Sequence, residues 1–490
     1  MEKNFYQYNK EALPQIVLDG HEDWIRLYDE AWQRAFDNVA YVKKAHWKPQ
    51  LTCMPGAGIV WQWDSCFMSF ITNYANGTIS AMNNLDNLYR LRRVSDGYMS
   101  MAYVIDTEKP AYGERINPPL MAWAEWQYYL MTGDDSRFVD IFPALDGLFS
   151  FIENNRRRVN GLYWFEDSGS SGMDNAPRSG YMAQNLLGSD VCFIDLACQQ
   201  VLSAQCISKI AGHLGYTEKA NNYIEETQRI MALINDKHWS ERKQFYFDLF
   251  ARSDATKKDK FINTKTLASA WTILTGVAAG ERLNYMVEHL FNPDEFYTPH
   301  PFASLSADDP NFDEKGSYWL GSVWAPTNYV VIRGLKEAGL TKLARTAAIK
   351  HLQYMADVNN DPSYGNIWEC YVPYYKAPAI TENGKIVASN FVGWSGLGPI
   401  TMLIENILGF SFDASQNTVC MNVTQTCKHG IKNLKFNGGK ISIVCEAPAN
   451  DGTRQIQVTT QKPFMLNLVA DDNATSVTFA VQTGGNRFSI

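Results

Sequence analysis

The links between the helical segments alternate between short and long, and this pattern limits the possible folds more than any other sequence feature. About twelve segments with helical periodicity precede residue 410. Short links such as Asn76-Gly77 and Gly339-Leu340 join some neighbours, whereas loops of roughly 20–35 residues join the others. The usual median is only ~4–6 residues. The segments are expected near residues 21–40, 64–75, 78–94, 118–132, 135–158, 190–213, 216–236, 264–277, 280–290, 320–338, 341–357 and 394–409.

A short link places two consecutive helices antiparallel, so the alternation predicts helical hairpins whose short links all lie on one side. Six such hairpins can close into an (α/α)6 toroid, a mainly α fold in which every second helix lines the centre. Each long loop then delivers its residues at the N-terminus of an inner helix. Because long loops in a compact domain usually serve a function, we expect the functional site on the long-loop side.

The pattern changes after residue 410. Alternating, β-rich stretches occur at 417–423, 440–445 and 455–459, with Asn- and Gly-containing turns between them. We therefore predict an (α/α)6 domain over residues 1–410 and a small antiparallel, sandwich-like β-domain over residues 411–490. Packing against the helices is the simplest role for the β-domain, and carbohydrate binding is the alternative.

The composition is that of a globular protein that does not bind nucleic acid. Of the 490 residues 46% are hydrophobic, and the net charge of −8 comes without any basic run. No apolar stretch reaches the roughly 18 residues of a membrane span, and the first residues lack the apolar core of a signal peptide. We expect a soluble protein without a membrane partner, cytoplasmic if Met1 is native and periplasmic if a signal peptide was removed. The oligomeric state stays open.

The cysteines indicate neither a disulfide framework nor a metal site. Their number, 9, is odd, no Cys-x-x-Cys occurs, and no pair of histidines has zinc spacing. No metal ligands are therefore assigned, and whether a calcium ion is bound stays open. Four cysteines fall in apolar helical stretches and are predicted to be small core residues: Cys66, Cys192, Cys198 and Cys206.

Clusters of polar and aromatic residues lie in the long loops. The first cluster, with Trp61, Trp63 and Asp64, opens the second helical segment, and the next places Arg115 and Asn117 before a double proline. Helix capping and core packing are the structural explanations for the first cluster, and a double proline is normal at a helix start. In a toroid, these side chains would all point toward the mouth.

A third cluster is the turn-rich stretch 168–178, which contains Asp174, Asn175 and Arg178. An Asx-turn alone could explain Asp174. The stretch follows Trp164, however, and an apolar wall beside a carboxyl group can raise its pKa.

A fourth cluster contains Trp368 and Glu369 among further aromatic residues. A surface position is the structural explanation for this glutamate. A glutamate buried among aromatic rings is otherwise costly unless it has partners or a catalytic task.

Tryptophan recurs at the starts of the predicted inner helices, at Trp319, Trp324 and Trp394. Aromatic residues make up 13% of the chain. Core packing could explain any one of these rings, but flat rings also stack on sugar faces. Tryptophan at nearly every mouth-side loop, together with a few carboxylates, favours a sugar pocket.

Cleavage of a glycosidic bond requires two carboxyl groups that face each other across the bond. One stays protonated and donates to the leaving oxygen, and the other is ionised as a base for water or as a nucleophile. Asp174 and Glu369 are the candidate pair. Sequence spacing does not give their separation, so it leaves the stereochemistry open.

In this order, the clusters resemble the six-hairpin glycosidases of the trehalase and processing α-glucosidase clan. The resemblance is greatest to glycoside hydrolase family 63 and its short bacterial members, which include mannosylglycerate hydrolases, and it covers roughly residues 55–410. The motifs that carry it are Trp63-Asp64-Ser65, the loop 171–178, the segment 318–324 (Tyr-Trp-Leu-Gly-Ser-Val-Trp) and Trp368-Glu369-Cys370-Tyr371.

The resemblance implies inverting hydrolysis of an α-linked sugar without a cofactor. Asp174 would protonate the leaving oxygen, and Glu369 would activate water on the opposite face of the ring. The partner would be a small carbohydrate, and a narrow pocket between long loops would favour exo action on short oligosaccharides or glycosides. The expected substrate contacts are Trp61, Trp63, Asp64, Arg115, Asn117, Trp164, Asn175, Arg178, Trp319, Trp324, Trp368 and Trp394.

The chain also departs from the family pattern. Leu320 and Ser322 stand where the motif has Arg and Pro, and Asn117 stands where a Gln often precedes the double proline. These differences bear on the leaving-group subsite more than on the catalytic pair. The sequence therefore names no substrate.

Two other functions remain open on the sequence. A sugar epimerase or isomerase on a similar toroid would usually need histidine for proton transfer at carbon, and only His46 and His300 fall on the predicted mouth-side loops before inner helices. A non-catalytic carbohydrate-binding protein would not need both carboxylates.

Overall fold

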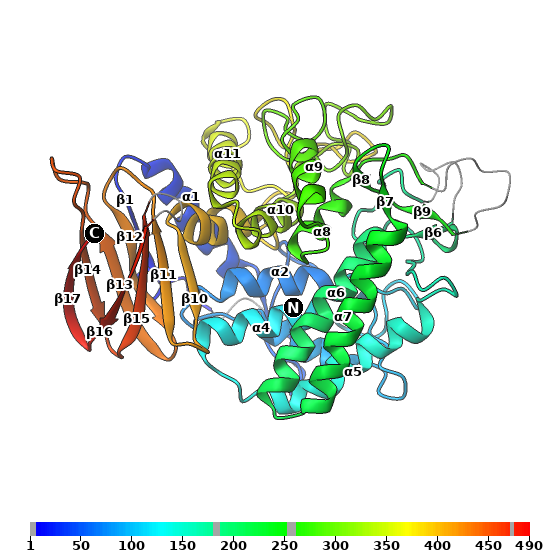
Figure 1. The fold of residues 1–490 in the computed structure, drawn as a ribbon, viewed down its shortest axis with the longest axis horizontal. Coiled ribbons are helices and arrows are strands. Elements are labelled where there is room, and N and C mark those ends of the chain that lie inside the picture. The colour runs from blue at the N-terminus through cyan, green and yellow to red at the C-terminus, as the bar shows by residue number, and fades with distance from the viewer. Residues whose placement is uncertain (1–5, 180–186, 252–260, 471–474) are drawn as a thin grey trace.

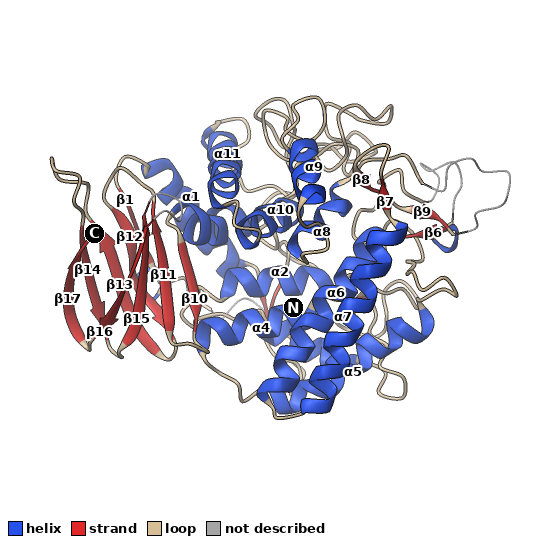
Figure 2. Ribbon diagram, in the orientation of Figure 1, coloured by secondary structure: helices blue, strands red, loops and turns tan. Residues whose placement is uncertain are grey.

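A computed structural model of the chain describes residues 6–179, 187–251, 261–470 and 475–490. Helices form most of the molecule, and the longer β-strands gather at one end of it (Figure 1 and Figure 2). Most buried apolar residues of the helical part and of the β-strands form one continuous core, and Leu162, Cys192 and Leu249 form a small separate cluster. Within the described ranges, no helix is both long and apolar enough to cross a membrane.

The predicted helical segments are present, most of them with ends within a few residues of the prediction. The structure has α1 (Glu22–Asp37), α2 (Gln62–Thr72), α3 (Met82–Leu91), α4 (Met121–Thr132), α5 (Phe138–Asn155), α6 (Ile194–His213), α7 (Thr217–Lys237), α8 (Trp271–Leu274) after the short η4 (Leu267–Ala270), α9 (Glu281–Leu290), α10 (Ala325–Glu337), α11 (Thr341–Asn360) and the π-helical η6 (Gly398–Ile407) after η5 (Ser395–Leu397). Two further short turns are η1 (Lys10–Ala12) and η3 (Gly188–Asp190).

The even-numbered helices α2 to α10, together with η5 and η6, contact one another in sequence, and these contacts close a ring. Contacts run from α2 to α4, to α6, to α8, to α10, and from α10 to η5 and η6, which in turn contact α2. The remaining helices lie outside this ring, with α3 against α2, α7 against α6 and α11 against α10. This alternation of inner and outer helices is consistent with the predicted (α/α)6 arrangement.

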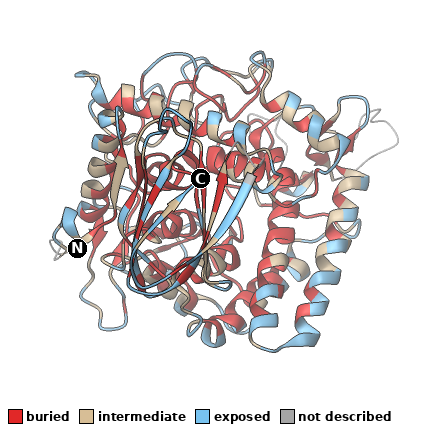
Figure 3. Cartoon of the chain, turned by 60° about the vertical axis from the view of Figure 1, so that its left-hand side comes forward, coloured by how far each residue is buried: buried red, intermediate tan, exposed pale blue. Residues whose placement is uncertain are grey.

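Inner and outer helices differ in how their surfaces are buried. Every residue of α2 is buried, whereas α7 buries only one stripe made of Ala220, Tyr223, Ile230 and Ile234. Exposed residues accordingly follow the outward faces of the peripheral helices in Figure 3. On a helix that is packed on all sides, every side chain must be apolar or have partners for its polar groups. A peripheral helix needs only one apolar face.

The β-strands at the end of the molecule form two sheets. One has the order β1-β12-β13-β14-β17 and the other β10-β11-β15-β16. The bounds are β1 (Gln15–Leu18), β10 (Phe410–Asp413), β11 (Thr418–Val423), β12 (His429–Phe436), β13 (Gly439–Cys445), β14 (Gln455–Thr460), β15 (Phe464–Ala470), β16 (Thr475–Val481) and β17 (Gly484–Ser489).

Two features of these sheets differ from the sequence-based prediction. Strand β11 pairs in parallel with β15, so the prediction of a purely antiparallel β-domain is wrong at this pair. Strand β1, from the N-terminal part of the chain, pairs antiparallel with β12, with Gln15 opposite Lys432. The alternating pattern of a strand does not reveal a partner that lies so far away in the sequence.

Small two-stranded sheets brace the long loops. They pair β2 (Val39–Ala40) with β3 (Gln50–Leu51), β4 (Ile59–Trp61) with β5 (Ala102–Val104), β6 (Val191–Cys192) with β9 (Leu249–Phe250) and β7 (Trp239–Ser240) with β8 (Phe245–Tyr246). Strand β4 runs directly into α2, so its pairing with β5 fixes the entry of an inner helix. The four cysteines predicted to lie in the core, Cys66, Cys192, Cys198 and Cys206, are all buried.

Candidate active site

A cavity of about 550 Å³ opens between the long loops at the N-terminal ends of the inner helices. A second cavity, of about 880 Å³, lies toward the short-link side between α4, α6, α7 and α10 and contains none of the predicted site residues. The first cavity brings most of those residues together: Trp61, Trp63, Asp64, Arg115, Asn117, Asp174, Asn175, Trp319, Glu369 and Trp394 all line it.

The Asp174 carboxyl group opens into this cavity. No hydrogen-bond donor in the described part of the chain reaches it, although its neighbour Asn175 is fixed on both sides. The side-chain N–H of Asn175 donates to the backbone carbonyl of Ser317 at 2.9 Å, and its Oδ1 accepts from the backbone N–H of Trp319 at 2.8 Å. The Asp174 side chain is exposed to the cavity, but partial desolvation by the surrounding protein, followed by the negative charge of Glu369, raises its pKa to about 7.

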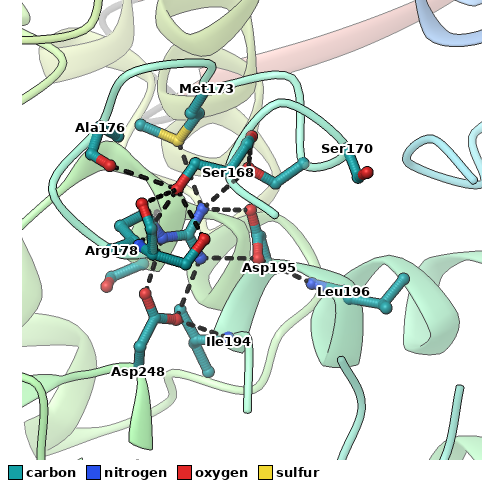
Figure 4. A network of polar contacts seen from close by, with 12 residues as sticks. Ser168, Ser170, Met173, Ala176, Arg178, Ile194, Asp195, Leu196 and Asp248 are labelled. Carbon is teal, nitrogen blue, oxygen red and sulfur yellow. Dashed lines mark hydrogen bonds and ion pairs between the residues drawn. The ribbon is translucent and has the colours of Figure 1, made fainter. Parts of the chain in front are cut away.

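The loop that carries Asp174 is held from behind by Arg178. The Arg178 side chain is fully buried and makes two hydrogen bonds each to Asp195 and Asp248, at 2.6 to 3.0 Å (Figure 4). The sequence suggests a substrate contact for Arg178, but its side chain points away from the cavity. The two aspartates come from α6 and from the segment before β9, and they fully compensate its charge.

Glu369 is half-buried and lines the same cavity. The Tyr318 hydroxyl donates to its Oε1 at 2.8 Å, and the backbone N–H of Ala388 donates to its Oε2 at 3.4 Å. The Trp394 indole N–H donates to its backbone carbonyl at 3.1 Å. Burial raises the pKa of Glu369, and the hydrogen bond from Tyr318 opposes this rise because it favours the ionised form.

Asp64 stands in the first turn of α2, and its carboxyl group also lines the cavity. The Cys53 thiol donates to its Oδ1 at 2.9 Å. Burial raises the pKa of Asp64 to about 7, against the opposing effect of that hydrogen bond.

Aromatic rings form the walls between these carboxyl groups. The ring of Trp63 meets that of Trp394 edge to face at 5.8 Å, and Trp61 stacks on Tyr112 at 5.2 Å. Gly172 has φ +80°, and a Cβ atom at this position would overlap the Trp63 ring. The loop that carries Asp174 can thus pack closely on Trp63 only because this position is glycine.

Three of the predicted tryptophans do not line the cavity. Trp324 stacks behind Trp319 with the ring centroids 4.1 Å apart, so it supports a wall without forming it. Trp164 packs against the guanidinium of Arg156 at 4.8 Å, a cation–π contact. Trp368 forms a β-bridge with Ser389 beside the Glu369 loop.

Several lining residues were not among those singled out from the sequence. Tyr318, Cys53, Tyr112 and Asp167 all line the cavity. Tyr318 could have been found, because it opens a motif that carries the family resemblance. Cys53 had no such signal, because its contact with Asp64 depends on how two separate loops meet.

The histidines of the predicted mouth-side loops lie elsewhere. His300 is buried and its Nε2 lies 2.9 Å from Nδ1 of His351, while His46 pairs with Glu108 at 2.8 Å. Along the described stretches, no histidine lines the cavity and no group of three or more His, Cys, Asp or Glu side chains could hold a metal ion. The epimerase alternative thus lacks its expected base in this cavity.

Relatives of the chain include both uncharacterized and characterized proteins. A protein of Borreliella burgdorferi described as uncharacterized is 28% identical over 94% of this chain and 95% of its own length. The mannosyl-oligosaccharide glucosidase of Saccharomyces cerevisiae is 23% identical over 61% of this chain. The match spans only 35% of that glucosidase.

Solved structures share the fold. The GH63 mannosylglycerate hydrolase of Thermus thermophilus aligns with a TM-score of 0.63 in its complex with glucose and 0.62 in its complex with Tris and D-glycerate. Each alignment has 18% identity and covers 77% of this chain and 100% of that one. Because the sequence identity is low, these structures support the fold alone.

The sequence pattern of one family covers most of the helical part of the chain. The family is described as "Mannosylglycerate hydrolase MGH1-like glycoside hydrolase domain", and it matches residues 59–383, which include every carboxyl group of the cavity. The resemblance to glycoside hydrolase family 63 is thereby confirmed. The chain belongs to the MGH1-like glycoside hydrolases and is a glycosidase.

Proposed function

We propose that this glycosidase is an inverting, exo-acting α-glycosidase in which Asp174 is the general acid and Glu369 the general base. We further propose that residues 1–410 form an (α/α)6 catalytic toroid and that residues 411–490, joined by β1, form a domain that packs against it. The substrate is a short oligosaccharide or glycoside.

One observation carries the assignment of roles: the two carboxyl groups have opposite hydrogen-bond environments. Asp174 receives no donor from the described residues, and its pKa of about 7 keeps a large fraction protonated at neutral pH. Glu369 accepts from the Tyr318 hydroxyl and the Ala388 N–H, which favour the carboxylate. Environments that separate the pKa values of two such groups distinguish the acid from the base.

The reaction then proceeds in one displacement. Glu369 removes a proton from a water molecule, whose oxygen attacks the anomeric carbon. The bond from that carbon to the leaving oxygen breaks as Asp174 gives its proton to this oxygen. Because water enters on the face opposite the leaving group, an α-glycoside yields the β-sugar first.

The size and walls of the cavity support a short substrate. Its volume of about 550 Å³ lies in the usual range for small-ligand sites. Trp61, Trp63 and Trp394 supply flat apolar faces, while Asp64 and Asn117 supply polar groups that can hold hydroxyls. This combination suits the alternating apolar faces and hydroxyl rims of a sugar ring.

A proton NMR time course with trehalose, kojibiose, nigerose, mannosylglycerate and similar α-glycosides tests the proposal. We expect one substrate to be cleaved with the β-anomer appearing before mutarotation. Early α-anomer would show retention and overturn the pairing of Asp174 with Glu369. A reducing sugar converted without hydrolysis would instead support the isomerase alternative.

A further inference from the structure

The cavity contains a single cationic side chain among the residues that the structure describes, and that cation is already paired. Nη2 of Arg115 lies 2.8 Å from Oδ2 of Asp167. The other ionisable acidic side chains of the lining are Asp64, Asp174, Glu369 and Glu382. A negatively charged substrate would therefore find no unpaired cationic side chain among the described residues of this site.

This ion pair lies beside the proposed general acid. A Cβ atom built on Gly169 would lie 3.3 Å from Oδ1 of Asp167, 3.7 Å from Oδ1 of Asp174 and 4.0 Å from Nη1 of Arg115. The three side chains thus converge on one point of the cavity wall. Because Asp174 donates its proton to the leaving oxygen, the leaving group must sit next to the Arg115–Asp167 pair.

The pair is held in place before any substrate arrives. Oδ1 of Asp167 accepts hydrogen bonds from the backbone N–H of Ser170 at 2.8 Å and from its hydroxyl at 3.1 Å. The carbonyl of Arg115 accepts from the backbone N–H of Met101 at 3.0 Å and from the Tyr98 hydroxyl at 3.2 Å. Asp167 therefore cannot easily turn away to free the guanidinium for a carboxylate of the substrate.

The balance of charge is negative even when the raised pKa values are taken into account. With Asp64 and Asp174 protonated, Asp167 offsets the one guanidinium, and Glu369, which is ionised as the proposed base, leaves an excess of negative charge. Residues 180–186, which follow the lining residue Ser179, contain no Asp, Glu, Lys or Arg. Glu369, Asp64, Asp167 and Glu382 all help to raise the pKa of Asp174, as expected of a negative field at that point.

We propose that the site takes α-glycosides whose leaving group is an uncharged polyol or sugar, and that it discriminates against leaving groups that carry a carboxylate. This inference rests on the proposed function. It separates the chain from the structurally similar hydrolase that was solved with D-glycerate bound. Like charges brought together in a partly enclosed site weaken binding strongly, whereas hydroxyl groups can accept from Arg115 and donate to Asp167 at once.

Matched pairs of substrates test the proposal directly. α-Glucosylglycerol is compared with α-glucosylglycerate, and α-mannosylglycerol with α-mannosylglycerate, since each pair differs only in a hydroxymethyl group against a carboxylate. We expect kcat/KM to favour the neutral member by about tenfold or more. Equilibrium binding of both members to the Asp174→Asn variant gives the same comparison without turnover.

The Asp167→Asn variant tests the cause. Its amide oxygen can still accept from Ser170, but the variant loses one negative charge and releases Arg115. We expect the preference for the neutral member to shrink by about tenfold or to reverse. The matched control is Asp135→Asn, which removes an exposed carboxylate that pairs with His213 away from the cavity, and which should leave the ratio unchanged.

Each outcome decides between the hypotheses. Faster cleavage or tighter binding of a glycerate glycoside would overturn the inference and leave the proposed glycosidase intact. An Asp167→Asn variant with an unchanged ratio would overturn the role of the ion pair. If other α-glycosides are cleaved but neither member of a pair is cleaved or bound, the site does not take polyol leaving groups and the inference fails. If no α-glycoside at all is cleaved or bound, the proposed function fails, and the inference fails with it.

Discussion

The Tyr318 hydroxyl donates a hydrogen bond of 2.8 Å to Oε1 of Glu369, and this contact joins the loop before α10 to the neighbouring loop that carries the proposed base. Tyr318 has a φ of +66°. A tyrosine rarely adopts this left-handed conformation, so surrounding contacts must hold it there. We therefore infer that Tyr318 is a positioning residue for the proposed base.

We expect Tyr318→Phe to move the acidic limb of the pH–activity profile upward. Loss of the hydrogen bond removes a group that favours the ionised form of Glu369, so its pKa rises further. As the pH is lowered, the variant should therefore lose activity at a higher pH than the unmodified protein does. Its maximal kcat should be reduced by about tenfold. A pH profile of kcat measures this, and an unmoved acidic limb would show that Tyr318 does not act through Glu369.

Asp174→Asn and Glu369→Gln should each lower kcat by about 100- to 10,000-fold while the fold stays intact. A glycosyl fluoride separates the two roles, because fluoride leaves without a proton. Asp174→Asn should regain much of its activity on the α-fluoride of the accepted sugar, and Glu369→Gln should not. Equal rescue of both variants, or of neither, would contradict the assignment; circular dichroism checks the fold.

The pH–activity profile of the unmodified protein should be bell-shaped. Asp174 works in its protonated form, so kcat/KM should decline as the pH rises through about 7, the pKa set by the enclosed site and by Glu369. On the acidic side, activity is lost as Glu369 takes up a proton. The Asp174→Asn variant assayed with a glycosyl fluoride provides the control, because it should lack the alkaline limb.

Arg178→Met should destabilise the protein by about 3–5 kcal/mol, because it leaves Asp195 and Asp248 buried without their counter-charge. Urea unfolding measures the change. The triple variant with Asp195→Asn and Asp248→Asn removes the uncompensated charges and should recover much of the stability. If the triple variant is as unstable as Arg178→Met, the charges are not the cause.

The sequence predicted the helical architecture well because local signals determine it. Helical periodicity and the alternation of link lengths placed α1 to α11 with small errors. The residues that form the walls of the cavity could also be predicted, because the starts of the inner helices must converge in a ring. What could not be predicted depends on contacts between distant segments.

Arg178 shows the limit most clearly. An arginine four positions after the proposed acid has the same appearance in the sequence whether it binds substrate or stabilises the loop. The answer depends on Asp195 and Asp248, of which the latter lies 70 residues away along the chain. The contact of Cys53 with Asp64 and the pairing of Arg115 with Asp167 were hidden for the same reason.

The pairing of β1 with β12 has a consequence for how the chain is made. β1 leaves the ribosome about 400 residues before its partner, so it must wait without a sheet while the helices are synthesised. A fragment limited to residues 411–490 would expose the edge of β12, with unpaired N–H and C=O groups that invite aggregation. Residues 411–490 therefore cannot complete this sheet by themselves, and a strand that is translated about 400 residues earlier is needed to cover the edge of β12.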